Sequence, residues 1–263
     1  MYADRGPGEG PPSSPGPDAM ATPPPELELD VAKRLAHLFR ASPDSVSRKL
    51  RGFPKYVPRE PLGRFLALYE LFKLAQPVKG AVVECGVYRG FSLLTWAKVA
   101  SVLEPEHVTR RIYGFDSFAG FPVVSDRDRG LGPEPAVGDM AADVQAELAA
   151  LLEAYDADRP HGHIPKVELI PGDMVHTIPA FVQRHPHLVV ALLFLDCDLY
   201  EPTRAALEHL VPRMPRGAVL AFDELDRPAW PGETLAALET IGLRSLRLRH
   251  LPWEPHLSYA VLD

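Results

Sequence analysis

The sequence predicts an α/β protein with a seven-stranded, mostly parallel sheet that ends in an antiparallel hairpin. From Gly80 onward, short apolar segments alternate with helical segments, as in parallel sheets that helices cover on both faces. Near the C-terminus, the strand-like segments 244–250 and 257–262 are joined by LPWEPH, which is too short for a crossover helix. The composition, 46% hydrophobic and 24% charged, is that of a globular protein.

The parallel part of the sheet follows from five apolar segments and the helices between them. We expect strands at 81–85, 111–116, 166–170, 188–195 and 217–222. We expect helices near 91–102, 140–156, 174–184, 202–211 and 233–241. Apolar strands that alternate with helices in this way indicate a parallel sheet covered on both faces.

The chain divides into three regions. Residues 1–26 are rich in proline and glycine, so they should lack a core and form a disordered tail, or alternatively a docking peptide. Residues 27–79 have two amphipathic helical patterns and should serve substrate binding or oligomer formation. Residues 80–263 should form the main domain. Within it, 119–164 is too long for a simple connection and is interpreted as a lid or substrate-recognition insertion.

Charge, hydropathy and cysteine content exclude several classes of protein. The chain has 28 Lys and Arg against 35 Asp and Glu, a formal net charge of −7, whereas a nucleic-acid binder should present a basic face. Its longest purely apolar run, Leu188–Leu195, is far shorter than the ~20 residues of a membrane-spanning helix. Cys85 and Cys197 are too few for a disulfide scaffold. We therefore expect a cytoplasmic protein without nucleic-acid or membrane partners.

The first chemical motif, VVECGVYRG at 82–90, closes the first predicted strand. Gly86 permits a tight turn that brings the backbone close to a ligand, and Gly90 lets the next helix pack closely. Glu84 can pair with a cation such as the ammonium group of a ligand. The motif alone is common, and its place between a strand and a helix is what predicts a ligand-binding turn.

Two further carboxylates follow predicted strands. Asp116, in YGFDSF, ends the second strand and precedes Ser117. A carboxylate at this position can accept both hydroxyls of a ribose, and capping of the next turn is the alternative. Asp173, in PGD, can accept a hydrogen bond from an adenine amino group or cap the helix that starts near Met174, and both roles can coexist.

Three acidic residues end the fourth and fifth strands. Asp196 is the first polar residue after the apolar fourth strand, and Asp223 and Glu224 follow the fifth. Ligands of open parallel sheets bind beyond the carboxyl ends of the strands, so we expect these acids to converge. Close carboxylates repel unless a proton or cation intervenes, and all-oxygen sites suit Mg²⁺ or Ca²⁺. Alternatively, these acids cap helices or face water.

The motifs VVECGVYRG, YGFDSF, LIPGD, LDCDLYEPT and AFDE occur in an order that resembles the macrocin O-methyltransferase family of the TylF and MycF type. The resemblance runs from about Phe53 to the C-terminus. It implies the Rossmann-like fold of class I methyltransferases, which have five parallel strands followed by a hairpin. It also implies Mg²⁺-assisted transfer of a methyl group from S-adenosylmethionine to a hydroxyl of a sugar or glycosylated natural product.

The resemblance assigns roles to individual residues. The cofactor-binding residues would be Glu84, Gly86, Gly90, Asp116, Ser117 and Asp173. Among these, Asp116 would take the ribose and Asp173 the adenine. The metal-binding acids would be Asp196, Asp223 and Glu224. Asp196 is also the expected catalytic base.

The sequence departs from the family at two points. The family usually has two aspartates after the fifth strand, whereas this chain has Asp223–Glu224, which leaves the metal dependence open. The family's catalytic histidine has no counterpart in 140–156.

Several readings of the function stay open at this stage. One alternative is a metal-independent methyltransferase acting on a phenol or peptide. Another is a nicotinamide-dependent oxidoreductase, which should have a G-x-G-x-x-G turn that this sequence lacks. The expected partner is a small-molecule acceptor, a sugar or glycoside. The apolar N-terminal helices would suit a homo-oligomer interface.

Overall fold

The computed structural model describes residues 25–263, which form two compact units, one ending at Leu62 and the other running from Gly63 to Asp263. In the first unit, α1 (Pro25–Ala41) confirms the first of the two helical patterns in residues 27–79. The short helix α2 (Val46–Arg51) was not predicted, because its six residues are too few to show an apolar period. The predicted tail falls almost wholly outside the described residues.

The second unit contains the seven-stranded sheet, in the order β3-β2-β1-β4-β5-β7-β6. The first five strands are parallel and β7 and β6 are antiparallel, as predicted. The strands are β1 (Ala81–Cys85), β2 (Ile112–Asp116), β3 (Val167–Pro171), β4 (Val190–Leu195), β5 (Val219–Phe222), β6 (Arg249–Leu251) and β7 (Glu254–Val261).

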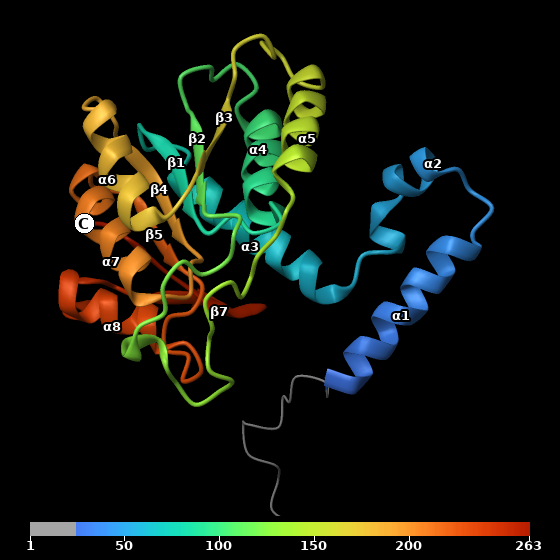
Figure 1. The fold of residues 1–263 in the computed structure, drawn as a ribbon. Helices are drawn as coiled ribbons and strands as arrows, with labels where there is room; N and C mark the ends of the chain where they lie inside the picture. Colours follow the sequence, from blue (N-terminus) through green and yellow to red (C-terminus); the bar gives the residue numbers. More distant parts are fainter. Residues whose placement is uncertain (1–24) are drawn as a thin grey trace, which may run out of the picture. The chain divides into compact units, whose positions relative to one another are not determined.

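Helices cover both faces of this sheet (Figure 1). The helices are α3 (Arg59–Ala75), α4 (Phe91–Leu103), α5 (Gln145–Ala157), α6 (Met174–Arg184), α7 (Tyr200–Leu210) and α8 (Pro231–Thr240). One core cluster joins α3, α4 and α5 to one face, and a second joins α6, α7 and α8 to the other. Side chains alternate between faces along each strand, so Val82 belongs to the first cluster and Val83 to the second.

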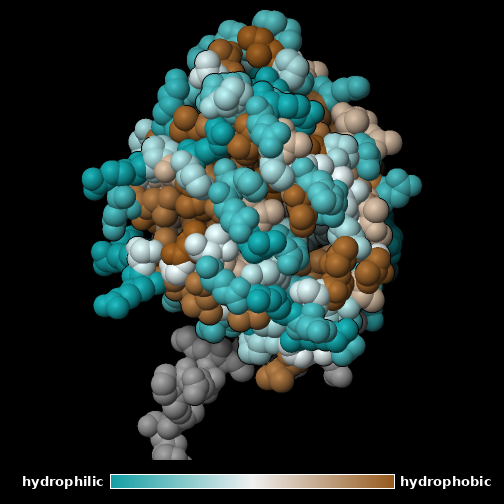
Figure 2. Space-filling view, turned by 60° about the vertical axis from the view of Figure 1, so that its left-hand side comes forward, coloured by the Kyte–Doolittle hydropathy of each residue, from teal (hydrophilic) through white to brown (hydrophobic). Residues whose placement is uncertain are grey.

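The outer surface is mainly polar where Figure 2 shows it, with apolar residues in scattered patches. Of the helices that the structure describes, none has the length and apolar character needed to cross a membrane. Cys85 and Cys197 are buried free thiols.

The C-terminal hairpin differs from the prediction in its boundaries. The segment 244–250 was expected to be one strand, but only its end pairs with β7, and a 3-10 turn occupies Leu243–Ser245. Leu246 and Leu248 pack on the second core cluster, so their apolar alternation reflects burial of a loop. The turn is also tighter than expected, because Leu251 pairs with Glu254.

Asp128 fixes the insertion after β2 to the start of α7. This buried carboxylate accepts hydrogen bonds from the backbone N–H of Tyr200 at 2.6 Å and from that of Ser125 at 2.7 Å. Asp128 thereby satisfies a free N–H at the start of α7. The N–H of Leu131 also donates to the carbonyl of Pro228 at 2.7 Å. The insertion is therefore hydrogen-bonded to the segments that follow β4 and β5.

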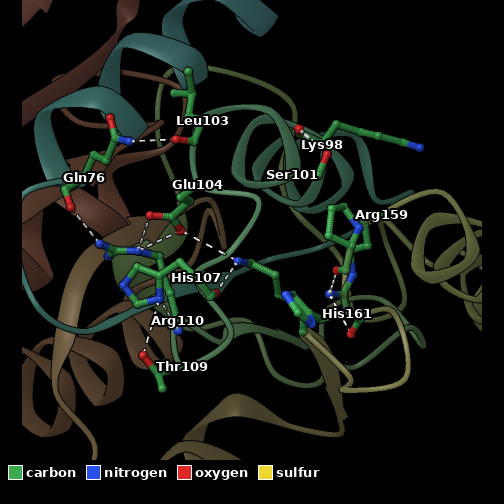
Figure 3. Close-up of polar contacts among 12 residues, drawn as sticks. Gln76, Lys98, Ser101, Leu103, Glu104, His107, Thr109, Arg110, Arg159 and His161 are labelled. Atoms are coloured by element: carbon green, nitrogen blue, oxygen red, sulfur yellow. Dashed lines mark hydrogen bonds and ion pairs between the residues drawn. The ribbon is translucent and has the colours of Figure 1, made fainter.

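A buried ion pair around Arg110 joins elements at the amino ends of the parallel strands (Figure 3). Its Nε donates to the Glu104 carboxylate at 3.1 Å, and its Nη atoms donate to the carbonyls of Gln76, Val78 and Gly80 at 2.8 to 3.0 Å. The Arg110 side chain is 2% exposed. One guanidinium thus links the ends of α3 and α4 to the starts of β1 and β2.

We predict that Arg110→Met lowers the free energy of unfolding by about 3–5 kcal/mol, because it breaks a buried ion pair. The Glu104 carboxylate would keep only the longer contact with Lys166 at 3.8 Å, and three carbonyls would lose their donors. Urea unfolding measures this change. The matched control is Arg129→Met, which removes an exposed arginine paired with Asp126 and should cost less than about 1 kcal/mol. Equal losses in the two variants would contradict a structural role for the Arg110 network.

Candidate active site

Loops at the carboxyl ends of β1 to β5 line a cavity of about 570 Å³. This is the edge where open parallel sheets bind ligands. Seven of the nine residues predicted for the site line the cavity. The seven are Gly86, Asp116, Ser117, Asp173, Asp196, Asp223 and Glu224.

The turn after β1 lies directly against the end of β4. Gly86 has φ +95°, and a Cβ at this position would overlap the carbonyl oxygen of Asp196. The N–H of Asp196 donates to the carbonyl of Cys85 at 2.8 Å. Only glycine allows the two backbones to come this close. The predicted tight turn is therefore present, and its contact with a ligand stays a prediction.

Asp116 organises the same turn through its carboxylate. Its Oδ2 accepts hydrogen bonds from the N–H groups of Val87 and Tyr88 at 2.8 and 2.7 Å, and its Oδ1 accepts one from the N–H of Phe118 at 2.6 Å. A carboxylate offers about four acceptor sites, so these three contacts leave room for about one ligand hydroxyl.

Asp173 and Ser117 occupy neighbouring positions on the cavity wall. Asp173 caps α6, since its Oδ1 accepts a hydrogen bond from the N–H of Val175 at 3.0 Å, which confirms the capping part of the prediction. The hydroxyl of Ser117 donates to the carbonyl of Gly120 at 2.6 Å and so ties the start of the insertion to the cavity.

Glu84 and Gly90 lie beneath the cavity rather than on its wall. Glu84 is fully buried, and its Oε2 accepts a hydrogen bond from the indole N–H of Trp96 at 2.6 Å. Burial raises the pKa of Glu84 well above its usual range. A side chain at Gly90 would overlap Leu148 of α5. Both residues therefore support the turn from below, and direct contact with a cofactor stays a prediction.

Asp196 and Asp223 converge as predicted, but an arginine lies between them. Arg64, in the first turns of α3, donates from Nη2 to Asp196 Oδ2 at 3.2 Å and from Nη1 to Asp223 Oδ1. Burial raises the pKa of Asp196, and Asp223 adds to this rise while Arg64 opposes it. Arg64 belongs to no sequence motif, and the helical and strand patterns did not predict its contact with these acids.

The neighbouring acids are held by other contacts. The Oε1 of Glu224 accepts a hydrogen bond from Arg227 at 2.9 Å, and its backbone N–H donates to Glu233 Oε1 at 2.8 Å. Burial raises the pKa of Asp198 and that of Glu224 to about 7, and nearby carboxylates add to both rises. The cavity wall is therefore acidic.

The arrangement does not fit a magnesium site. Among the described residues, no group of three or more His, Cys, Asp or Glu side chains is placed to hold a metal ion. Arg64 takes the position between Asp196 and Asp223, and Glu224 turns to Arg227. The three acids predicted to bind the metal therefore lie close together, but their oxygens accept hydrogen bonds from arginines.

Two positioning residues escaped the sequence analysis. Arg64 could not have been found, because its partners are remote in sequence. Asp128 had a visible signal, since Ser125 and Asp128 form a capping box with the S/T-x-x-D/E spacing of a helix start.

Residues 67–236 match the macrocin O-methyltransferase (TylF) family. The chain belongs to this family. The structural relatives agree: a crystal structure of CalS11, described as a calicheamicin methyltransferase, is 35% identical, with a TM-score of 0.87 over 96% of this chain and 99% of that one. A structure of the apo form, described as a TDP-rhamnose 3'-O-methyltransferase, is 33% identical, with a TM-score of 0.78 over 94% of this chain and 99% of that one.

Two family members match by sequence over part of their length. The 8-demethyl-8-(2,3-dimethoxy-α-L-rhamnosyl)-tetracenomycin-C 4'-O-methyltransferase of Streptomyces olivaceus is 33% identical over 57% of this chain and 55% of its own. The mycinamicin III 3''-O-methyltransferase of Micromonospora griseorubida is 28% identical over 59% of each chain. The matched segments therefore span little more than half of these two relatives.

We predict that Gly86→Ala destabilises the protein by about 3 kcal/mol or more, because it combines backbone strain with a clash against Asp196. Gly138→Ala is the matched control: Gly138 has a similar φ of +90° but nothing lies within 4 Å of its Cβ position. The control should therefore lose only about 1–2 kcal/mol, the cost of the left-handed conformation. Urea unfolding of both variants measures the difference, and similar losses would show that the clash is unimportant.

Proposed function

We propose that this protein transfers a methyl group from S-adenosylmethionine to a hydroxyl of a sugar. One observation carries the proposal: a single cavity is lined both by the turn that Gly86 and Asp116 form and by the carboxylate of Asp196. The first part suits the cofactor, and the second suits a hydroxyl that must lose a proton. When bound, the cofactor supplies an electrophilic methyl group on its sulfonium.

The cofactor would lie across the ends of β1, β2 and β3. In this placement its amino-acid end would meet the turn at Gly86, a ribose hydroxyl would donate to Asp116, and its adenine would lie near Asp173. All three residues line the cavity, in the order that the strands have in the sheet. The membership of the chain in a methyltransferase family supports this placement.

The acceptor would lie between the acidic edge and an apolar wall. Phe121, Val123 and Met140, all from the insertion, line the cavity. Phe121 is held by Trp230, edge to face with ring centroids 6.0 Å apart. A sugar ring matches both walls. Its C–H groups can pack on apolar side chains, and its hydroxyls can donate hydrogen bonds to carboxylates.

The relatives narrow the class of sugar. CalS11 is described as acting on TDP-rhamnose, and the Streptomyces olivaceus enzyme by its name methylates a rhamnosyl group. Rhamnose is a 6-deoxyhexose, whose methyl group adds apolar surface. We therefore propose a 6-deoxyhexose of the rhamnose type, free, nucleotide-linked or part of a glycoside, as the methylated group.

In the proposed reaction, Asp196 would accept the proton of the acceptor hydroxyl. The bound cofactor would supply the methyl group, whose bond to sulfur would break as its bond to the acceptor oxygen forms, which would leave S-adenosylhomocysteine. The cavity would hold the two reactants close together, within about 3–3.5 Å. Arg64, which also donates to Asp223, fixes the orientation of the Asp196 carboxylate through its hydrogen bond to that carboxylate. No step of this reaction uses a divalent cation, since the acids are not arranged to bind one.

The acceptor class is tested with isotopically labelled S-adenosylmethionine and three acceptors: TDP-rhamnose, a methyl rhamnoside and catechol. We expect label on the ring hydroxyls of at least one rhamnose compound and none on catechol, because the cavity suits a ring that carries both hydroxyls and apolar C–H groups. Mass spectrometry detects the product. Transfer to catechol alone would support a phenol methyltransferase instead.

We predict that Asp196→Asn lowers kcat by about 10²–10⁴-fold, since it removes the general base. Calorimetry should show S-adenosylhomocysteine binding close to that of the wild type, because the predicted cofactor contacts are made by Gly86, Asp116 and Asp173 and not by the Asp196 side chain. Asp126→Asn, at an exposed acid of the insertion paired with Arg129, is the control and should keep full turnover. Equal loss of turnover and of cofactor binding in Asp196→Asn would count against the assignment.

A further inference from the structure

We propose that the Arg64 guanidinium is the resident cation of the Asp196–Asp223 pair, and that a divalent ion can bind these acids only by displacing it. The inference rests on the proposed function in one respect: the pair belongs to the site where methyl transfer is proposed. It adds a role for Arg64, a residue outside the sequence motifs.

The geometry supplies the first argument. Asp196 follows β4 and Asp223 follows β5, and these strands are hydrogen-bonded neighbours. Arg64 extends from α3 to both carboxylates and gives each of them a separate Nη donor. The planar fork of a guanidinium can bridge two carboxylates in this way, whereas an ammonium group acts as a single point charge.

Burial supplies the second argument. The Arg64, Asp196 and Asp223 side chains are only 18%, 25% and 14% exposed. The guanidinium also lies over the ring of Phe194, with 5.4 Å from Cζ to the ring centroid, a distance at which a cation is attracted to an aromatic face. Arg64 is therefore held by three groups of the second unit, and its charge offsets a pair of half-buried carboxylates.

Charge supplies the third argument. The two carboxylates would repel each other without a cation between them. A divalent ion that bound the same oxygens would lie beside the guanidinium, and the two positive charges would repel in a half-buried site. Arg64 and the divalent ion are thus alternative occupants of one position. While Arg64 is in place, it acts as a positioning residue for Asp196.

The test is a titration of the full chain with Mn²⁺, followed by electron paramagnetic resonance and by calorimetry. We expect Arg64→Met to bind one Mn²⁺ at least about tenfold more tightly than the wild type, because the acids have lost their internal cation. Arg64→Lys should lie between the two. The matched control is Lys73→Met, which removes a positive charge from an exposed pair with Glu70 on the same helix and should bind Mn²⁺ like the wild type.

A further variant places the ion. Adding Asp196→Asn to Arg64→Met should abolish the gain in Mn²⁺ affinity, since it removes one of the two acids. Equal Mn²⁺ affinities for the wild type and Arg64→Met, both folded by circular dichroism, would overturn the proposal. If Arg64→Met does not fold, Arg64→Lys decides: tighter Mn²⁺ binding than in the wild type supports the proposal, and equal binding overturns it.

Binding of S-adenosylhomocysteine separates this inference from the proposed function. A wild type that binds S-adenosylhomocysteine while Arg64→Met gains no Mn²⁺ affinity would refute only the role of Arg64. A folded wild type that binds no S-adenosylhomocysteine would refute the methyltransferase proposal, and the Mn²⁺ titrations would still report on the Asp196–Asp223 pair.

Discussion

The contact between Gly86 and the backbone of Asp196 is the constraint on which the site depends. It holds the turn after β1 against the end of β4, at the point where the order of the parallel strands changes direction. A side chain at position 86 would separate these two segments. Because the turn proposed to bind the cofactor and the acidic edge meet there, their separation would divide the cavity that the proposed reaction needs.

The second feature of the site is a balance of charge in a partly buried space. Asp196, Asp198, Asp223 and Glu224 line the cavity, and Glu233 lies fully buried beneath Glu224. Two arginines offset these acids at different places, Arg64 between the aspartates and Arg227 at Glu224. An acidic wall favours acceptors that donate hydrogen bonds, and it disfavours a phosphate close to the reacting hydroxyl.

In the proposed function, the insertion links the stability of the fold to the selection of the acceptor. Asp128 fixes the insertion to the start of α7, and the hydrogen bond between Ser117 and Gly120 fixes its beginning at the cavity. Its apolar side chains then form one wall of the cavity. If the proposal holds, changes in this segment would alter which acceptor fits and would leave the acids at the strand ends unchanged.

The sequence alone determined the strands, most helices and the acids at the strand ends, because these features are local. The apolar runs specify β1 to β5, and Asp116, Asp173 and Asp196 reach one edge because parallel strands place their carboxyl ends together. Only the tertiary structure decided what these acids contact. Arg64 is 132 residues from Asp196 and 159 from Asp223. Glu84 is buried and accepts a hydrogen bond from Trp96. Most of 244–250 packs as a loop. Such pairings depend on how distant elements pack, which no local pattern encodes.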